Sequence, residues 1–274
     1  MKICILGGSG QLGYELSKDL EKLDFDIVSL RRKDLDITNL DSCYEILNSI
    51  RPEFVIHAAA YTDIDGCEKT PDLAYSVNTS GTENITKAVE KIGAKLVYVS
   101  TDHVFDGVKG SPYDEYDTPN PINVYGMSKY NGELIVKKNL EKYFIVRTSS
   151  IFGHRSKNLI KAITNLTNTN TILNIISDQK RSPTYSADFS TALIQLLNNE
   201  DYGIYHLVNK GSCSWYEFVQ YIFKIKEMEV KVVPIDSRDL QLIAKRPENV
   251  SLNNSSYIRL KSWEEAVEEY LTFT

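Results

Sequence analysis

The sequence predicts an α/β fold, with a doubly wound parallel sheet followed by a smaller, mixed α/β C-terminal lobe. Short apolar runs recur along the first 147 residues, and each is followed by a segment with helical periodicity. The first of these runs leads directly into a glycine-rich turn. Beyond Arg147 the alternation is lost, and Asn/Thr-rich and proline-interrupted segments follow, which predicts the change of architecture.

The individual elements follow from the apolar pattern. Strands are predicted at residues 3–6, 27–30, 54–56, 96–99 and 144–146. Helices are predicted between them at about 11–23, 40–50, 72–92 and 121–139. We therefore expect a main domain over residues 1–150 and a second lobe over residues 151–274. The run at residues 203–209 resembles a strand that returns to the main sheet, so the two domains need not be separated by a single boundary in the sequence.

The bulk composition is that of an ordinary globular chain and argues against several classes of protein. The formal net charge is -6 over 274 residues, and no basic run exceeds Arg31-Arg32-Lys33, so we expect no nucleic-acid partner. No stretch reaches the roughly 18 apolar residues of a membrane span, so no membrane partner is expected. The four cysteines form no CxxC pair, which favours reduced thiols, a cytoplasmic location and no metal site.

The glycine-rich turn lies between the first strand and the first helix. Gly7, Gly10 and Gly13 frame it, and Gln11 and Leu12 begin the helix. Because glycine has no side chain, the backbone can approach a pyrophosphate, and the helix N-terminus offers free N–H groups and a favourable dipole. In this strand-turn-helix setting the motif predicts a dinucleotide cofactor site of the Rossmann type.

The end of the second strand bears on which dinucleotide binds. Folds that prefer NAD usually carry an acidic residue there for the ribose 2′-hydroxyl, whereas this chain has Arg31 and Arg32. A guanidinium favours a 2′-phosphate, so Arg31 predicts NADPH, with NADH as the alternative cofactor. The other interpretation is a solvated surface pair, since arginine is usually exposed.

A tyrosine and a lysine four residues apart can serve hydride-transfer chemistry. The tyrosine gives a proton to a carbonyl oxygen, and the nearby ammonium lowers the pKa of the tyrosine. The chain has three such pairs, beginning at Tyr14, Tyr125 and Tyr257. Only Tyr125 and Lys129 begin the helix between the fourth and fifth strands, opposite Thr101 at the carboxyl end of the fourth strand. Thr101, Tyr125 and Lys129 are therefore the predicted catalytic residues.

Ten motifs spread over nearly the whole chain carry a specific resemblance. They are Gly10-Gln11-Leu12-Gly13, Asp34-Leu35-Asp36-Ile37-Thr38, Ala58-Ala59-Ala60-Tyr61-Thr62, Val77-Asn78, Ser100-Thr101-Asp102-His103-Val104-Phe105-Asp106-Gly107, Tyr125-Gly126-Met127-Ser128-Lys129, Arg147-Thr148-Ser149, Asp178-Gln179, Pro183-Thr184 and Arg246-Pro247. Together they resemble the dTDP-4-dehydrorhamnose reductase family of the extended short-chain dehydrogenases/reductases.

The resemblance implies roles for residues that spacing alone does not assign. Gly10, Gln11 and Leu12 would hold the pyrophosphate, Asp36 and Ile37 the adenine, and Lys129 the nicotinamide ribose. The rest of the cofactor would contact Ala58, Ala60, Tyr61 and Thr62. Tyr125 would be the proton donor, assisted by Thr101. The nucleotide-sugar substrate would meet Asp102, His103, Val104, Phe105, Ser150 and Arg246.

The implied reaction is NADPH-dependent reduction of the C4 ketone of a nucleotide-linked 6-deoxyhexose. The leading substrate is dTDP-4-dehydro-L-rhamnose, which would become dTDP-L-rhamnose for cell-surface polysaccharide biosynthesis. A homodimer is left open. Another nucleotide-sugar reductase or an epimerase of the same superfamily, or a non-catalytic regulatory subunit resembling that of methionine adenosyltransferase, are the alternatives. A dehydratase is disfavoured because His103 stands where that class has a glutamate.

The departures from the family pattern fall on the substrate side. His103 stands where the family usually has Tyr, Ser150 where it has Trp, Arg181 where it has Gly, and Val250 where it has Ser. His103 is expected to hydrogen-bond the sugar, with proton transfer as the alternative. Some relatives bind Mg²⁺ through a carboxylate at the place of Glu15, but its partner carboxylates are not identifiable here and no metal is predicted.

Overall fold

A six-stranded parallel sheet forms the centre of the molecule. The computed structural model describes residues 1–155, 160, 172–254 and 257–273. The strand order is β10-β5-β4-β3-β1-β2, and every neighbouring pair is parallel. The strands are β1 (Lys2–Leu6), β2 (Asp26–Leu30), β3 (Phe54–His57), β4 (Lys95–Thr101), β5 (Tyr143–Thr148) and β10 (Gly203–His206). This confirms the predicted doubly wound sheet.

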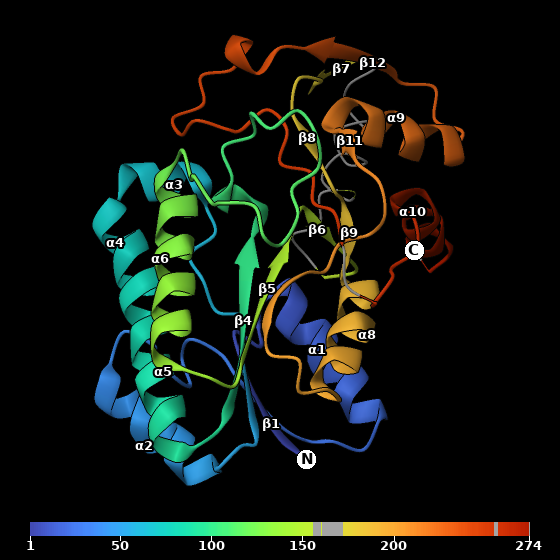
Figure 1. The fold of residues 1–274 in the computed structure, drawn as a ribbon. Coiled ribbons are helices and arrows are strands. Elements are labelled where there is room, and N and C mark those ends of the chain that lie inside the picture. Colours follow the sequence, from blue (N-terminus) through green and yellow to red (C-terminus); the bar gives the residue numbers. More distant parts are fainter. Residues whose placement is uncertain (156–159, 161–171, 255–256, 274) are drawn as a thin grey trace.

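Helices cover both faces of the sheet, as Figure 1 shows. One face packs against α1 (Gln11–Lys22) and α8 (Ser186–Leu197), and the other against α2 (Leu40–Ile50), α5 (Gly81–Ile92) and α6 (Val124–Asn139). Two apolar cores result, one on each side. The central strands are buried on both faces, which is why they read as continuous apolar runs in the sequence.

The helix predicted over residues 72–92 is interrupted. It consists of α4 (Pro71–Tyr75), a π-helical turn (Ser76–Ser80) and α5, and the short helix α3 (Ile64–Lys69) precedes it. The π turn carries Asn78, which is buried and points back to the segment after β3. The Asn78 side chain accepts from the Tyr61 N–H at 2.8 Å and donates to the Tyr61 carbonyl at 3.0 Å. Such local widenings of a helix are common at functional sites.

The C-terminal lobe lies above the carboxyl ends of the sheet strands (Figure 1). It contains paired short strands, β7 (Ile172–Ile176) with β12 (Lys231–Ile235), β8 (Lys180–Arg181) with β11 (Cys213–Ser214) and β6 (Ile151–Phe152) with β9 (Thr184–Tyr185). The helices α9 (Trp215–Ile225) and α10 (Trp263–Thr272) form its core with these strands. Short 3₁₀ turns occur at Asp102–Val104 and Ser237–Asp239.

The chain returns from this lobe to the main sheet. The helix α8 packs on one face, and β10 pairs with β5 along residues 203–206. Segments from both sides of residue 150 therefore build the central domain, and the functional division at residue 150 stays a prediction. None of the described helices is long and apolar enough to cross a membrane.

Candidate active site

Two adjoining cavities open at the carboxyl ends of the parallel strands. The first has a volume of about 280 Å³ and the second of about 530 Å³. Both are lined by Gly10, Ala58 and Ala60, where they meet. Of the predicted site residues, the first cavity holds Gly7, Arg31, Asp36, Ile37 and Tyr61. The second holds Gln11, Leu12, Gly13, Thr62, Thr101, Asp102, His103, Tyr125, Lys129, Ser150 and Arg246.

The turn after β1 is shaped by its glycines. Gly7 has a φ of +88°, and a Cβ there would lie 2.8 Å from the Ala59 nitrogen. A Cβ at Gly13 would lie 2.8 Å from the Gly7 carbonyl carbon. The helix α1 begins directly afterwards with Gly10 as its N-cap and no side-chain capping bond. Its first N–H groups are therefore available to an anion at the cavity.

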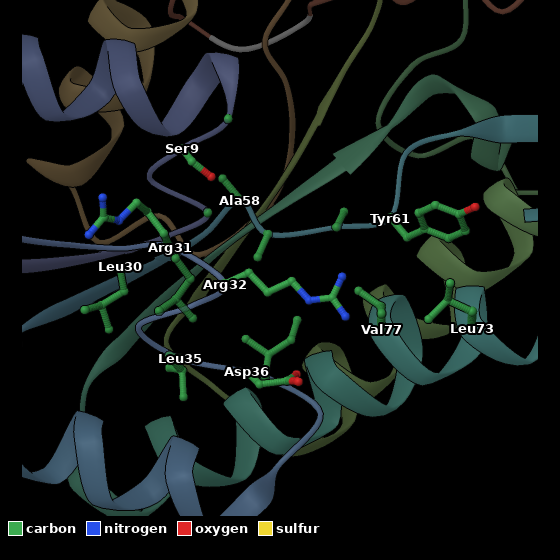
Figure 2. A pocket seen from close by; sticks show the side chains of 16 residues that line it. Ser9, Leu30, Arg31, Arg32, Leu35, Asp36, Ala58, Tyr61, Leu73 and Val77 are labelled. Atoms are coloured by element: carbon green, nitrogen blue, oxygen red, sulfur yellow. The ribbon is translucent and has the colours of Figure 1, made fainter. Parts of the chain in front are cut away.

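Figure 2 shows how the two arginines after β2 differ. The Arg31 side chain turns away from the pocket centre, and its Nε donates to the Asp34 carboxylate at 2.8 Å. The Arg32 side chain instead extends across the cavity toward Val77. Its positive charge also lowers the pKa of Asp36, after the stronger effect of hydrogen bonds from Thr38. Arg32 therefore presents the guanidinium to this cavity, whereas the sequence had singled out Arg31.

The predicted catalytic residues come together in the second cavity. Burial raises the pKa of the Tyr125 phenol above its ordinary value, and the neighbouring Thr101 hydroxyl opposes this shift. The Lys129 ammonium donates to the Val99 carbonyl at 2.8 Å and lies 4.0 Å from the centre of the Tyr98 ring. The two rival tyrosines, Tyr14 and Tyr257, are 45% and 63% exposed and line neither cavity.

Lys129 is 2% exposed, and burial lowers its pKa to about 7. The Glu133 carboxylate, one helical turn further along α6, opposes this shift. Glu133 is itself bound by Arg147 through two hydrogen bonds, Nε to Oε1 at 2.9 Å and Nη2 to Oε2 at 2.7 Å. The Ser100 hydroxyl donates to the same carboxylate at 2.6 Å. A buried ion pair thus underlies the catalytic residues and ties α6 to β4 and β5.

A second buried ion pair lines the cavity itself. Arg181 donates from Nη1 to the Asp102 carboxylate at 3.1 Å. Asp102 also accepts from Thr101 at 2.9 Å and from Ser149 at 2.7 Å. Burial raises the pKa of Asp102, but Arg181 and the other neighbours outweigh it, so the pKa lies below its ordinary value. Asp102 is therefore held as a carboxylate beside Thr101.

Two of the predicted substrate residues lie elsewhere. Val104 and Phe105 are fully buried in an apolar cluster with Tyr113, Val250 and Leu252, and they line neither cavity. The 3₁₀ turn after β4 directs them into this core. Val250, one of the expected departures from the family pattern, thus belongs to this core and lines neither cavity.

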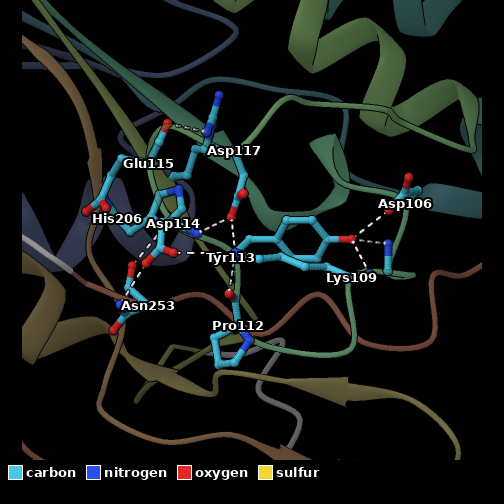
Figure 3. A network of polar contacts seen from close by, with 11 residues as sticks. Asp106, Lys109, Pro112, Tyr113, Asp114, Glu115, Asp117, His206 and Asn253 are labelled. Atoms are coloured by element: carbon cyan, nitrogen blue, oxygen red, sulfur yellow. Dashed lines mark hydrogen bonds and ion pairs between the residues drawn. The ribbon is translucent and has the colours of Figure 1, made fainter.

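The loop after Phe105 is fixed by the polar network in Figure 3. The Tyr113 hydroxyl donates to Asp106 at 2.6 Å, and its ring stacks on Phe105 with centroids 4.2 Å apart. Asp114 accepts from Asn253 at 2.7 Å. These contacts join the loop to the C-terminal segment and hold Phe105 away from the cavity.

Nine residues that line the second cavity were not predicted as site residues. Four of them that can contact a ligand through a polar or aromatic side chain are Thr148, Gln179, Arg181 and Trp215. The Thr148 Oγ1 and Gln179 Nε2 atoms are buried without a hydrogen-bond partner in the described part of the chain, so they are available to a polar ligand. Thr148 and Gln179 belong to two of the motifs that carry the family resemblance, and this could have identified them as site residues. Trp215 begins α9 directly after its capping residue Ser214, and nothing in the local pattern placed it at the cavity.

Ser150 and Arg246 do lie at the cavity. Ser150 has a φ of +46°, a left-handed conformation that is uncommon for a residue with a Cβ and is often found at functional sites. Arg246 donates to the Asp65 carboxylate at 2.8 Å, and Asp65 also accepts from the Ala244 N–H at 2.9 Å. Through Asp65, the helix α3 holds the segment that carries Arg246.

The other three histidines each contact another protein group. His57 contacts Thr82 at 3.1 Å, His154 contacts the Tyr185 hydroxyl at 2.9 Å, and His206 contacts the Asn253 carbonyl at 2.9 Å. The four cysteines are free and buried. Within the described ranges, no three or more His, Cys, Asp or Glu side chains gather in a metal-binding arrangement.

Comparisons with known proteins agree along the whole chain. The family model described as RmlD substrate binding domain matches residues 1–273. The chain is 37% identical to a dTDP-4-dehydrorhamnose reductase of Aggregatibacter actinomycetemcomitans, over 92% of this chain and 90% of the relative. It is 34% identical to the spore coat polysaccharide biosynthesis protein SpsK of Bacillus subtilis (strain 168), over 98% and 96% of the two chains.

Solved structures agree with these relatives. A dTDP-4-dehydrorhamnose reductase from Bacillus anthracis in complex with NADP superimposes with a TM-score of 0.97 at 40% identity, over 100% of this chain and 99% of the other. A UDP-glucose 4-epimerase from Thermus thermophilus in complex with NAD gives a TM-score of 0.83 at 19% identity, over 99% and 98% of the two chains. The second likeness concerns the fold alone.

Proposed function

The chain belongs to the RmlD substrate binding domain family, and we propose that it is a dTDP-4-dehydrorhamnose reductase. It uses NADPH to reduce the C4 ketone of dTDP-4-dehydro-L-rhamnose, and the product serves polysaccharide biosynthesis. The observation that carries the assignment is the meeting of Thr101, Tyr125 and Lys129 in one cavity, beside the glycine turn. Relatives with 37% and 40% identity bear the same name.

The first cavity and the glycine turn fit a dinucleotide. The glycines make a backbone cradle that side chains would fill, and α1 supplies free N–H groups for the pyrophosphate. Asp36 and Ile37 would lie beside the adenine, and Ala58 to Thr62 beside the middle of the cofactor. Arg32, which reaches over the cavity, is the residue we assign to the 2′-phosphate. NADPH, when bound, supplies the hydride.

The chain's own residues supply the proton and the electrostatic setting. The Tyr125 hydroxyl donates its proton to the substrate carbonyl oxygen as that oxygen gains negative charge. The Thr101 hydroxyl favours the ionised form of Tyr125, because it lowers the pKa of the phenol. Lys129 acts as an ammonium, which stabilises the tyrosinate electrostatically and would hydrogen-bond the nicotinamide ribose. Glu133 supports that charge, because its carboxylate raises the pKa of Lys129 against the effect of burial.

The second cavity suits an anionic, polar substrate. Arg181 and Arg246 place two guanidinium groups on its wall, and guanidinium is the preferred partner of phosphate. Trp215 adds an aromatic surface for a base or a sugar. The unpartnered Thr148 and Gln179 atoms can bond to hydroxyl or carbonyl groups. These features support a nucleotide sugar as the substrate.

We also propose that the protein works in the cytoplasm, consistent with its four free cysteines. A measurement of its mass in solution tests whether it forms a homodimer.

The test follows NADPH absorbance with dTDP-4-dehydro-L-rhamnose as substrate and identifies the sugar product by mass and NMR. Oxidation of NADPH with formation of dTDP-L-rhamnose is expected. Replacement of Tyr125 by Phe should lower kcat by at least about 100-fold, because general acid catalysis contributes on this scale, while NADPH binding persists. The Tyr14→Phe variant is the matched control, since Tyr14 lies outside both cavities. Interconversion of sugar epimers without net NADPH oxidation would contradict the reductase assignment.

A further inference from the structure

The orientation of the Asn123 amide is fixed by two backbone groups. Asn123 is the N-cap of α6, and its Oδ1 accepts from the Gly126 N–H at 2.8 Å. Its Nδ2 donates to the Lys245 carbonyl at 2.9 Å. A backbone N–H can only donate and a backbone carbonyl can only accept, so both contacts identify the same atom as nitrogen.

This orientation determines the protonation of His103. The His103 Nδ1 atom lies 3.1 Å from Asn123 Nδ2. Because the amide nitrogen only donates, Nδ1 must accept, and the single ring proton of a neutral His103 resides on Nε2. A protonated ring would set an Nδ1–H group against the amide hydrogens. Both residues are buried, with exposed fractions of 5% and 6%, so water cannot relieve that conflict.

The charges around His103 reinforce the neutral form. Burial and the guanidinium groups of Arg181 and Arg246 lower the pKa of His103, the Asp102 carboxylate opposes them, and the resulting pKa is about 3. Tyr125 is a further titratable neighbour, and its ring meets the imidazole edge-on with centroids 5.5 Å apart. His103 is therefore neutral at the pH of the cell and unsuited to donate the proton of the reaction.

The other ring nitrogen is available to a ligand. His103 lines the second cavity beside Tyr125, and among the residues that the structure describes Nε2 has no assigned protein acceptor. We propose that His103 donates its Nε2 proton to an oxygen of the hexose, and that Asn123 holds the imidazole in the tautomer that permits this bond. The proposal rests on the proposed function and deepens it, because it names the donor that occupies the position of the family's tyrosine.

The first test measures the tautomer directly in the free protein. The protein with ¹⁵N-labelled histidine is studied by NMR between pH 5.5 and 8, and the His103 signals are assigned by their loss in a His103→Phe variant. We expect a protonated Nε2, an unprotonated Nδ1 and no titration. A protonated Nδ1, or a titration near the ordinary histidine pKa of about 6.5, would overturn the proposal.

Ligand addition then tests the contact with the sugar. The ligands dTDP and dTDP-L-rhamnose differ only in the hexose, so the comparison isolates the sugar. The Nε2 signal should shift with dTDP-L-rhamnose and stay in place with dTDP. Equal shifts with both ligands would contradict a bond to the hexose.

Kinetics of matched variants test the role in turnover. Gln places its amide nitrogen near the Nε2 position, Asn reaches only the Nδ1 position, and Phe keeps the ring without a donor. His103→Asn and His103→Phe should lose about tenfold in kcat/KM, the scale of one hydrogen bond, and His103→Gln should recover most of this loss. Equal values for His103→Phe and the unmodified protein would refute the proposal. A fall in His103→Gln as large as that of Tyr125→Phe would refute it too, by indicating proton transfer.

Asn123→Asp tests how the tautomer is held. Aspartate caps a helix as well as asparagine does and can still accept from Gly126, but it offers an acceptor to His103 Nδ1. We expect the Nδ1–H form or a raised His103 pKa by NMR, with a fall in kcat/KM of about tenfold or more and unchanged helix content. Retention of the Nε2–H tautomer would refute the role of Asn123.

If the unmodified protein does not oxidise NADPH with dTDP-4-dehydro-L-rhamnose, the proposed function fails, whereas the NMR result for the free protein stands by itself.

Discussion

The buried ion pair between Glu133 and Arg147 offers a sharp test of how α6 is held. Both side chains are almost inaccessible, at 1% and 2% exposure, and two hydrogen bonds join them. Glu133→Gln preserves the shape of the side chain but removes its charge. Arg147 is then left as a buried cation, and the loss of one partner from such a pair costs about 3–5 kcal/mol. We expect about 3 kcal/mol, at the lower end of that range, because glutamine still accepts one hydrogen bond.

Urea unfolding followed by circular dichroism measures this loss. With a slope of about 3 kcal/mol/M, the midpoint should fall by about 1 M. Glu83→Gln is the matched control: Glu83 pairs with Lys87 on the exposed face of α5, with exposed fractions of 44% and 52%, and its loss should cost less than about 0.5 kcal/mol. The double variant Glu133→Leu/Arg147→Met removes both charges and should recover most of the stability.

The same substitution has a kinetic signature. Glu133 favours the charged form of Lys129, whose pKa burial lowers to about 7. Glu133→Gln should therefore move the alkaline limb of kcat/KM to lower pH. A loss of less than about 1 kcal/mol in Glu133→Gln, or a double variant less stable than the single one, would refute the reasoning.

Three further predictions follow from the cavities and the buried histidines. Arg32→Ser should raise the KM for NADPH about tenfold or more and leave the KM for NADH nearly unchanged, whereas Arg31→Ser, the control, should change both little. Gly13→Ala should weaken NADPH binding measured by calorimetry, because its Cβ would meet the Gly7 carbonyl; unchanged affinity would contradict the described turn. Burial lowers the pKa of His57 and His103 to about 3 and of His206 to about 4, so below pH 6.5 the unfolded chain binds protons that the folded chain does not. The free energy of unfolding should then fall as pH falls from about 6.5 toward about 4, by about 1.4 kcal/mol per pH unit for each histidine, and a constant urea midpoint over this range would contradict it.

The strands of the main sheet were predictable because a strand that is buried on both faces consists of consecutive apolar residues. The five strands predicted before residue 147 differ from the observed ones by at most two residues at their ends, whereas the returning strand predicted at 203–209 ends at His206. The helix predicted from residue 121 begins at Val124, because Asn123 caps it. Thr101, Tyr125 and Lys129 were predictable because the carboxyl ends of neighbouring strands place them at one edge.

The cavity wall was less predictable because tertiary contacts decide it. Phe105 belongs to the motif that starts at the end of β4, yet it stacks on Tyr113 in the core. Arg181 and Trp215 reach the cavity from the C-terminal lobe, and no local pattern connects them to β4. The different orientations of the Arg31 and Arg32 side chains likewise depend on the ion pair between Arg31 and Asp34. The sequence spacing alone does not decide which of the two arginines forms this pair.

The return of β10 to the central sheet has a consequence for how the chain can be divided. A fragment that ends near residue 150 would lack both the partner strand of β5 and the helix α8 that covers Phe144 and Val146. It would expose an unpaired strand edge and an apolar face, which are features that lead to aggregation. During synthesis on the ribosome the nascent N-terminal half must remain in this incomplete state until residues 186–206 have emerged. Fragments intended for separate study of the cofactor site therefore need this later segment.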